Sequence, residues 1–387
     1  MAGVYIHIPF CEKKCVYCDF YSITNKTLIN NFILALLNEI DLFVEKHQKI
    51  ERKIETIYLG GGTPSLLQPV DLERIISKLN EHFELTELKE FTIECNPGTN
   101  FLRKLLDYKK IGINRISIGV QSLHTDELRF LGRIHSKEEA IHSIEEASSI
   151  FNNVSVDIIF SIPCQTRKTL NETLDQLLAL DIKHISAYSL IYEEGTPLHK
   201  DLRYGKIYPK NEEEDFELYK LIRNKLENNG FLHYEVSNFA KPGYKSIHNL
   251  GYWQYKEYFG FGPSAHSFFN GKRQWNVRDL RLYIQMLQKR NLPIQDYELI
   301  TFEKKLFEKV MLGLRSEGIN LQTFKDEFGI DLSKAFVEIL QIWIQSGKAI
   351  IENGTLRLTG DGYFICDKLT LDLIESIENK RKTFKSF

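Results

Sequence analysis

The stretch "VYIHIPFCEKKCVYCDF", from Val4 to Phe20, joins a predicted strand to a compact group of cysteines. Val4–Ile8 is rich in β-branched residues, which favour a strand. Cys11, Cys15 and Cys18 follow at C-x3-C-x2-C spacing, and no fourth cysteine lies nearby. Zinc sites and iron–sulfur cubes usually take four ligands, so three thiolates leave one position for another ligand. The stretch therefore predicts a strand whose C-terminal end carries an incomplete metal site.

Short β-rich runs alternate with helical patterns over roughly the first half of the chain. A helical pattern covers Leu28–Lys46, for example. Parallel strands need a long crossover connection, which is usually a helix, so the β–α repeat predicts an α/β fold with a parallel sheet. In such folds the ligand site lies at the C-terminal ends of the strands. The predicted strands are Val4–Ile8, Thr56–Leu59, Phe91–Cys95, Arg115–Val120, Val154–Phe160 and His184–Ile191.

The regular alternation of strand and helix patterns ends after residue 210. A charged helical pattern ends at Gly230, and an aromatic stretch covers Tyr252–Phe269. Further helical patterns follow, and "ENG" at 352–354 is an Asn-Gly hairpin signal. We therefore predict a barrel core over 1–210, an extension over 211–299 and a helical, winged-helix-like domain over 300–387. The neutral overall charge favours a packing or lid role for that last domain over DNA binding.

Composition restricts the setting of the protein. The net charge of −2 and the pI near 6.6 give no basic field for nucleic acid. Six cysteines in 387 residues are too few for a secreted disulfide scaffold, and we expect Cys95, Cys164 and Cys366 to be ordinary buried thiols. The N-terminus has no signal-peptide pattern, and no stretch reaches about 18 uncharged apolar residues. We expect a cytoplasmic protein, and contact with a membrane surface stays open.

Polar residues follow several of the predicted strands. Glu94 ends the third strand, Gln121 follows the fourth, and Asp157 lies in the fifth. Arg133 stands in "LGRIHS", and the glycine turn 60–62 follows the second strand. A carboxylate can hold a ribose diol, an arginine can pair with a carboxylate, and glycines let a ligand approach the backbone. Together these residues predict a polar pocket at the C-terminal edge of the sheet.

The cysteine spacing, with Tyr17 before the last cysteine, resembles the radical S-adenosylmethionine superfamily, as does "GGGTPS" at 60–65. The resemblance implies a partial (β/α)6 barrel of the TIM type, with a [4Fe-4S] cluster on Cys11, Cys15 and Cys18. It also implies that S-adenosylmethionine binds the open iron. Residues implied to bind that cofactor are Tyr5, Tyr17, Gly61, Gly62, Thr63, Glu94, Gln121, Arg133 and Asp157.

The resemblance becomes narrower in "YIHIPFC", "ECNPG", "GVQS", "LGRIHS" and "HISAYSLIYEEGTPL". These segments resemble the oxygen-independent coproporphyrinogen III oxidase-like family, and the resemblance runs from Tyr5 to at least Trp275, with weaker similarity beyond it. In that family the dehydrogenases carry a fourth cysteine where this chain has Phe20, and they carry an N-terminal extension that we do not expect in this protein. The HemW-type heme chaperones instead share the "CDF" ending and a His-Asn-x-x-Tyr-Trp motif, which stands here as "HNLGYW". Heme contacts are implied for His248, Asn249, Tyr252 and Trp253, with His233, Tyr234 and His266 as secondary candidates.

Three hypotheses stay open at this point. The first is a heme chaperone with a cluster and S-adenosylmethionine that passes heme to respiratory hemoproteins. The second is a radical enzyme that oxidatively decarboxylates coproporphyrinogen III, and the third is a structural zinc or cluster protein, in which His7 or His135 could complete a zinc site. Whether the chain turns over a substrate is therefore open. Ser161 and Cys164 stand where relatives usually have glycine, so the loop beside the cofactor is expected to differ.

Overall fold

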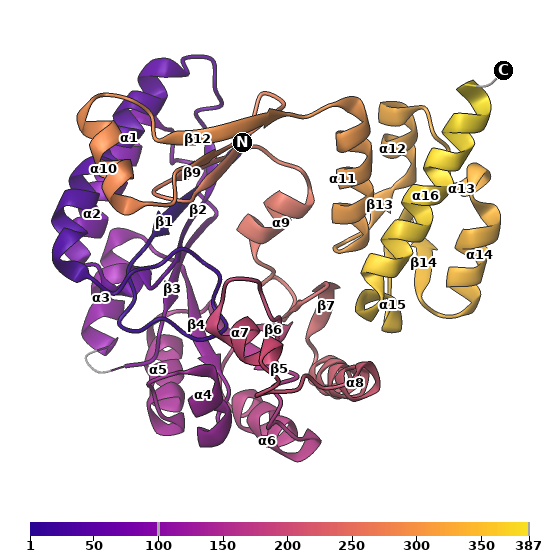
Figure 1. Cartoon of the computed structure of the whole chain (residues 1–387), viewed down its shortest axis with the longest axis horizontal. Coiled ribbons are helices and arrows are strands. Elements are labelled where there is room, and N and C mark those ends of the chain that lie inside the picture. The colour runs from indigo at the N-terminus through magenta and orange to yellow at the C-terminus, as the bar shows by residue number, and fades with distance from the viewer. Residues whose placement is uncertain (99–100, 386–387) are drawn as a thin grey trace.

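The computed structural model describes residues 1–98 and 101–385 of the chain (Figure 1). A twelve-stranded sheet in the order β12-β11-β10-β9-β1-β2-β3-β4-β5-β6-β8-β7 forms its centre. Its strands are β1 (Ala2–Ile8), β2 (Ile54–Gly61), β3 (Glu90–Cys95), β4 (Arg115–Gln121), β5 (Val154–Phe160), β6 (His184–Ser189), β7 (Leu232–Glu235), β8 (Asn238–Ala240), β9 (Tyr258–Phe261), β10 (His266–Phe269), β11 (Lys272–Asn276) and β12 (Ile294–Leu299). The helices along it are α1 (Ile29–Lys46), α2 (Pro69–His82), α3 (Phe101–Ile111), α4 (Thr125–Leu131), α5 (Lys137–Ile150), α6 (Arg167–Leu178), α7 (Pro197–Arg203), α8 (Glu212–Asn228), α9 (Ile247–Trp253) and α10 (Leu280–Gln288).

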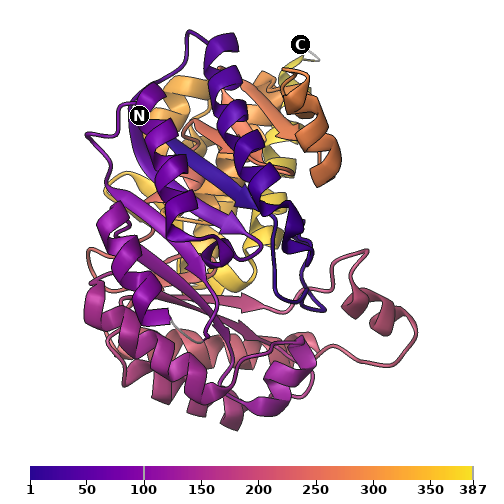
Figure 2. The same ribbon diagram turned by 90° about the vertical axis from the view of Figure 1, so that its left-hand side faces the viewer.

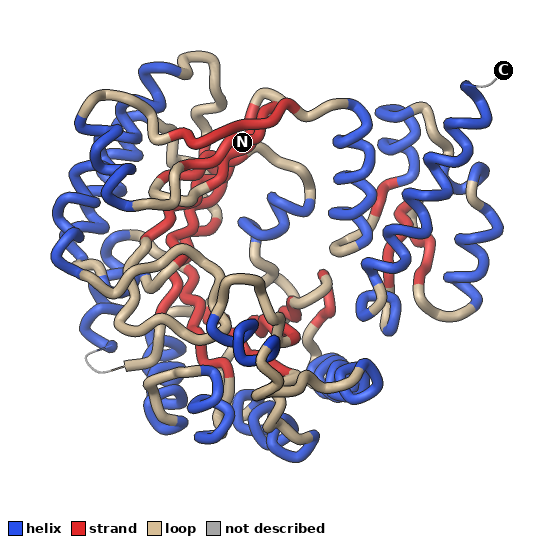
Figure 3. Tube along the Cα trace, in the orientation of Figure 1, coloured by secondary structure: helices blue, strands red, loops and turns tan. Residues whose placement is uncertain are grey.

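Strands β1 to β6 lie side by side in chain order, and each neighbouring pair is parallel. Crossover connections between parallel strands are right-handed, so an unbroken order places their helices on one face of the sheet. Helices from the first half of the chain cover that outer face (Figures 2 and 3). The prediction of six parallel strands in an α/β fold is confirmed, and the sheet is an open, partial barrel because β12 and β7 form its two edges.

Side chains alternate along these strands between an apolar outer face and a polar inner face. On β1, for example, Val4, Ile6 and Ile8 are fully buried in the apolar core. Tyr5 and His7 point the other way, as the two-residue period of a strand requires. Inner residues of the other strands bond to one another, as Ser155 Oγ does with His184 Nδ1 at 2.8 Å. The inner face is therefore available for ligand chemistry.

The second half of the chain extends this sheet at both edges. Strand β9 pairs in parallel with β1, and β10, β11 and β12 continue from it as antiparallel strands. Strands β8 and β7 add to β6 at the other edge. Helix α9 connects the two edges and lies against the first residues of β1, β2 and β3, since His248 contacts Gly3 and Thr56, and Glu90 accepts from the amide of Ile247.

A smaller three-stranded sheet, β13-β15-β14, lies with several helices beside the large sheet (Figure 1). The hairpin predicted at 352–354 is confirmed, because Asn353 and Gly354 have φ of 49° and 72°, as a type I′ turn requires. Arg273 joins the two parts through Glu308, at 2.8 Å. The division of the chain at residues 210 and 299 stays a prediction. Elements of this part are α11 (Phe302–Leu314), β13 (Ile319–Asn320), α12 (Leu321–Phe328), α13 (Leu332–Ala335), α14 (Val337–Gln345), β14 (Ala349–Glu352), β15 (Thr355–Leu358), α15 (Asp361–Phe364) and α16 (Cys366–Lys385).

The segment Lys26–Lys46, which includes α1, is long and apolar enough by composition to span a membrane. Buried core helices pass the same test. Phe32, Leu36 and Ile40 of α1 are fully buried against the sheet and the neighbouring helices. Its apolar face is therefore accounted for by the core of the protein.

Gly62 provides a test of how closely the cysteine loop packs on the sheet. A Cβ at Gly62 would lie 2.6 Å from the carbonyl oxygen of Phe10 and 2.8 Å from that of Ile8. Because backbone atoms cannot easily move aside, Gly62→Ala is expected to lower the free energy of unfolding by about 1–3 kcal/mol. Urea unfolding measures the change. Gly98→Ala is the control, since nothing lies within 4 Å of its Cβ position; an equal loss in both variants would contradict the packing argument.

Candidate functional site

The cysteine loop begins where β1 ends and is held against the start of the next loop. The amide of Gly62 donates to the carbonyl of Ile8 at 2.8 Å, and the amide of Thr63 donates to the carbonyl of Phe10 at 2.7 Å. Gly61 has a φ of 108° and its Cβ position is filled by His7, so a side chain there would be strained and crowded. These contacts fix the cysteines at the C-terminal edge of the sheet.

Two of the three half-buried cysteines receive hydrogen bonds from outside their own loop. Thr63 Oγ1 donates to Cys11 Sγ, and Arg133 Nη1 donates to Cys15 Sγ, each at 3.7 Å. These donors fix the orientation of two of the three sulfurs. Burial is the main cause that raises the pKa of Cys18 to about 11, and repulsion from Cys15 and Cys11 adds to it. The three thiols are thus close enough to interact electrostatically, as the ligands of one metal centre would be.

A single zinc ion would hold its ligand sulfurs at a defined spacing. Four sulfurs around one zinc at about 2.3 Å would lie about 3.8 Å apart. Among the described residues, three candidate ligand atoms lie within 4.8 Å of one another only in the group Asp41, Glu81 and His82. The three cysteine sulfurs do not form such a group as they lie here, so one zinc ion could be shared by all three only after their side chains rotate.

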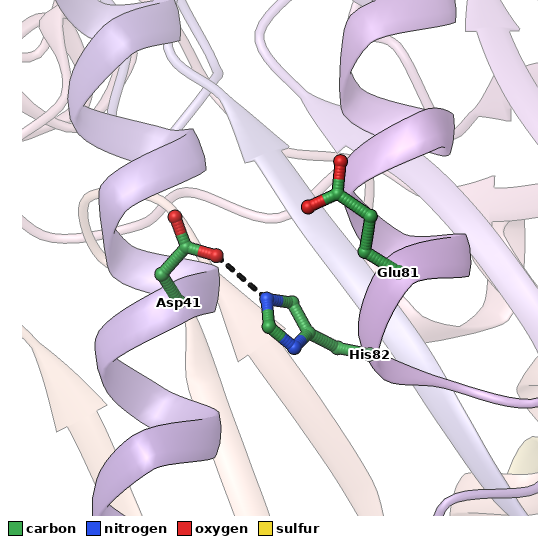
Figure 4. A group of neighbouring side chains, drawn as sticks. All are labelled: Asp41, Glu81 and His82. Atoms are coloured by element: carbon green, nitrogen blue, oxygen red, sulfur yellow. Dashed lines mark hydrogen bonds and ion pairs between the residues drawn. The ribbon is translucent and has the colours of Figure 1, made fainter.

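The group Asp41, Glu81 and His82 lies on α1 and α2, on the outer face of the sheet (Figure 4). His82 Nε2 lies 2.6 Å from Asp41 Oδ1. Lys78 Nζ also lies 3.1 Å from Asp41 and 2.6 Å from Glu81. Because an ammonium group already compensates these carboxylates, we interpret the group as an ion-pair network that joins the two helices.

A cavity of about 800 Å³ lies beside the cysteine loop and is lined mainly by aromatic rings. Phe20, at the end of the loop, borders it and is 65% exposed. Glu94, Arg273 and Arg278 supply charged groups in its wall. Such a lining suits a flat, largely apolar ligand that carries a few charged groups. Rings in the wall include Tyr5, Tyr58, Tyr252, Tyr258, Phe268 and Trp275.

Glu94 is the centre of a hydrogen-bond network in this cavity. Its carboxylate accepts from Tyr58 Oη at 2.8 Å and from the amide of Gly61 at 3.2 Å. Burial, helped by the nearby charge of Asp157, raises the pKa of Glu94 to about 7 against the effect of these donors. A positively charged ligand group would favour the ionised form. Glu94 therefore suits the binding of a cation.

The residues predicted to bind S-adenosylmethionine divide between two cavities. Tyr5, Gly61 and Glu94 line the large cavity. Thr63 and Arg133 line a second cavity of about 370 Å³, which also borders Cys15. The structure thus places both groups near the cysteine loop, but in two separate cavities.

The other four predicted residues line neither cavity. Tyr17 packs in a small apolar cluster, and Gly62 contacts the backbone of the loop. Asp157 accepts a hydrogen bond from Ser117 at 3.3 Å, and Gln121 ends β4 with a φ of 66°. The structure does not bring these four into contact with either open space, so their role in cofactor binding stays a prediction.

The motif "HNLGYW" forms α9, whose N-terminus is capped by Ser246. His248, Asn249 and Tyr252 line the large cavity, whereas Trp253 does not and lies beside Glu235. The motif and part of the predicted S-adenosylmethionine site therefore share one space, a juxtaposition that the sequence alone does not reveal.

His248 is buried and both of its ring nitrogens have partners. Nδ1 lies 2.8 Å from Thr56 Oγ1, and Nε2 lies 2.8 Å from Tyr252 Oη. The ring also stacks on Tyr58 at a centroid distance of 5.1 Å. Burial and the positive charge of Arg115 lower the pKa of His248 to about 3, so the imidazole is neutral at neutral pH. His248 is held as part of the wall in this structure.

Ser161 and Cys164 lie in the loop that follows β5, and the structure tests what the sequence predicts for each. Cys164 is exposed, so the expectation of a buried thiol is wrong there, although it is confirmed for Cys95 and Cys366. It lies in the loop after β5, where its side chain is outside the core. Ser161 adopts a φ of 60°, the conformation for which glycine is usual, and its hydroxyl bonds to Asp215.

Sequence reasoning missed the rim of the large cavity. Trp275, Arg273 and Arg278 lie on or just after β11, which pairs with β10. The signal was present, because Asn270 and Gly271 form an Asn-Gly turn between these strands, with φ of 51° and 68°. The secondary candidates also separate: His266 lines the cavity, whereas His233 and Tyr234 do not.

The raised pKa of Glu94 predicts a pH effect on stability. The folded protein holds this proton more tightly than the unfolded chain, so the contribution of Glu94 to stability is lost as pH rises from about 4.5 to about 7. Between about pH 5 and about pH 7.5, the free energy of unfolding should therefore fall by about 1–2 kcal/mol less in Glu94→Gln than in the wild-type protein. Urea unfolding at both pH values measures it. Glu84→Gln, an exposed position, is the control, and an unchanged pH dependence in Glu94→Gln would refute the argument.

Comparison with known proteins identifies the family to which the chain belongs. A profile described as "Radical SAM superfamily" matches residues 5–177, and one described as "HemN C-terminal domain" matches residues 300–365. The heme chaperone HemW of Bacillus subtilis is 35% identical over 94% of this chain and 96% of its own length, and that of Lactococcus lactis is 32% identical over 93% and 94%. Coproporphyrinogen III oxidase (HemN) of Escherichia coli has the same fold, with a TM-score of 0.80 at 20% identity over 96% of this chain and 89% of that chain. The chain belongs to the HemW heme chaperone family within the Radical SAM superfamily.

Proposed function

We propose that this protein is a heme chaperone that binds heme in the large cavity and transfers it to a hemoprotein. The observation that carries the proposal is that one aromatic cavity of about 800 Å³ borders the cysteine loop and α9 together. Relatives named as heme chaperones align over nearly their whole length, which supports the same role here.

The lining of the cavity matches the chemistry of heme. Heme is a flat apolar macrocycle, so it gains from packing against rings such as those of Tyr58, Tyr252 and Phe268. Its two propionates need positive partners, and Arg278 offers a guanidinium group whose side chain is 58% exposed. Both features occur on the walls of the same space.

The superfamily implies a [4Fe-4S] cluster and S-adenosylmethionine as resident cofactors. We assign the cluster to Cys11, Cys15 and Cys18, because these three closely spaced cysteines lie within the segment that matches the superfamily and donors reach two of their sulfurs. S-adenosylmethionine, when bound to such a cluster, supplies a carbon radical on one-electron reduction. We assign its ammonium group to the neighbourhood of Glu94, where a carboxylate accepts from Gly61.

The alternative function is the oxidative decarboxylation of coproporphyrinogen III. Similarity to the Escherichia coli oxidase at 20% identity shows the common fold alone. Phe20 stands where the dehydrogenases carry a further cysteine, and here this ring is exposed at the cavity. An apolar ring would pack on either tetrapyrrole, so it is the absence of that further cysteine that favours the chaperone. A cytoplasmic location, contact with a membrane surface and the identity of the acceptor hemoprotein stay predictions.

Cys15→Ser tests the cluster assignment. Loss of one of three thiolate ligands is expected to remove most of the bound iron and the visible absorbance of the cluster, while the protein stays folded. Iron analysis and circular dichroism after anaerobic reconstitution measure both. Cys164→Ser, at an exposed cysteine outside the loop, should keep the wild-type iron content. Full iron content in Cys15→Ser would show that the ligand assignment is wrong.

Anaerobic binding and turnover assays separate the two functions. The reconstituted protein is expected to bind hemin with a Soret band and to form no protoporphyrinogen from coproporphyrinogen III when S-adenosylmethionine and a reductant are supplied. Heme-loaded protein should then lose its Soret band to an added apo-hemoprotein. Conversion of coproporphyrinogen III would establish the enzyme instead. Zinc in metal analysis, with neither activity, would support a structural metal protein.

A further inference from the structure

Resting on the proposed heme-chaperone function, the structure assigns the iron of the bound heme to His266 rather than to His248. The assignment comes from the state of each histidine in the large cavity. Three histidines line it: His7, His248 and His266. An imidazole binds iron through a nitrogen lone pair, so a ligand must offer a ring nitrogen that is both accessible and without a competing partner.

His7 and His248 do not offer such a nitrogen. His7 Nε2 lies 2.8 Å from the carbonyl of Tyr21, and its Nδ1 lies 3.1 Å from Tyr5 Oη. His248 is engaged at both nitrogens as well, by Thr56 and Tyr252. Freeing either ring would break two hydrogen bonds of buried groups, at about 1–3 kcal/mol for each group left without a partner.

The packing around His248 also blocks the approach of a metal. A Cβ placed on Gly3 would lie only 3.3 Å from His248 Cε1, so the backbone of β1 passes directly beside the ring. Tyr58 covers one face of the ring by stacking. His248 therefore acts in this structure as a positioning residue that fixes Tyr252 in the cavity wall.

His266 is in the opposite state. It is exposed, it lines the cavity, and neither ring nitrogen has a hydrogen-bond partner among the described residues. It is the first residue of β10 and lies directly opposite Trp275 of β11. The two rings stack at a centroid distance of 5.7 Å and an angle of 23°. The strand pair and this stacking hold the imidazole at the rim without occupying its nitrogens.

The neighbours of His266 fit a heme plane next to it. Side chains two residues apart on a strand share a face, so Phe268 lies beside His266, and Arg273 lies beside Trp275 on the paired strand. All four line the cavity. A ligand at the rim also suits a carrier, because an acceptor protein can replace an exposed ligand without opening the core of the donor.

The test compares ferric-heme spectra of the reconstituted full-length protein and its variants. His266→Ala is expected to shift the Soret band, to remove the low-spin histidine-ligated signal in electron paramagnetic resonance, and to weaken heme binding by about tenfold or more. Added imidazole should restore the histidine-like spectrum. His248→Gln should keep the ligand signature, and His142→Ala, at an exposed position on α5, should match wild type.

A second measurement uses the unaltered protein. Modification with diethyl pyrocarbonate, located by mass spectrometry, should label His266 without heme and spare it when heme is bound. An unchanged spectrum in His266→Ala, loss of the ligand signature in His248→Gln alone, or equal labelling of His266 with and without heme would each overturn the assignment while leaving heme binding intact. Absence of heme binding in wild type would instead refute the proposed function and the assignment with it.

Discussion

A buried carboxylate at the start of β3 holds the functional half of the molecule together. Glu90 accepts from the amides of Ile247 and His248, at 2.7 and 3.1 Å, and from Ser246 Oγ at 3.2 Å. Burial alone would lower the pKa of Arg115 nearby, but the negative charge of Glu90 and further neighbours such as Asp157 together outweigh it, and the pKa is raised. The carboxylate therefore satisfies the free amides at the beginning of α9 and is itself compensated. Without it, α9 would leave several buried polar groups without partners.

The position of α9 decides how the two halves of the sheet share a ligand space. Because β1 to β6 wind in one direction, their helices cover the outer face, and the inner face keeps polar and aromatic side chains. Helix α9 closes this space at the N-terminal ends of the strands, where His248 reaches Thr56. The cysteine loop closes it at the opposite ends, where β1 leads into Pro9. The large cavity is what lies between these two closures.

Local sequence patterns predict the fold more completely than they predict the functional site. The strands, the helix at Leu28–Lys46 and the hairpin at 352–354 follow from short-range periodicity and turn chemistry, and the structure agrees within a few residues. The site depends on contacts between distant segments. Thr56 and His248 are 192 residues apart. No local pattern indicates that the helix formed by HNLGYW packs against the first residues of β1, β2 and β3. For the same reason the sequence could not separate His248 from His266, since both are histidines in an aromatic region.

The cysteine loop and the rim of the cavity are one mechanical unit. Arg278 Nη2 donates to the carbonyl of Asp19 at 3.1 Å, and the amide of Leu280 donates to Tyr21 Oη at 2.9 Å. Both bonds join the end of the loop to the segment that follows β11. A cluster that ties the three cysteines together would restrict the same loop, and so would preserve these two supports of the rim. The cysteine loop is therefore joined to the rim of the large cavity by ordinary hydrogen bonds, which a cluster on the three cysteines would help to keep in place.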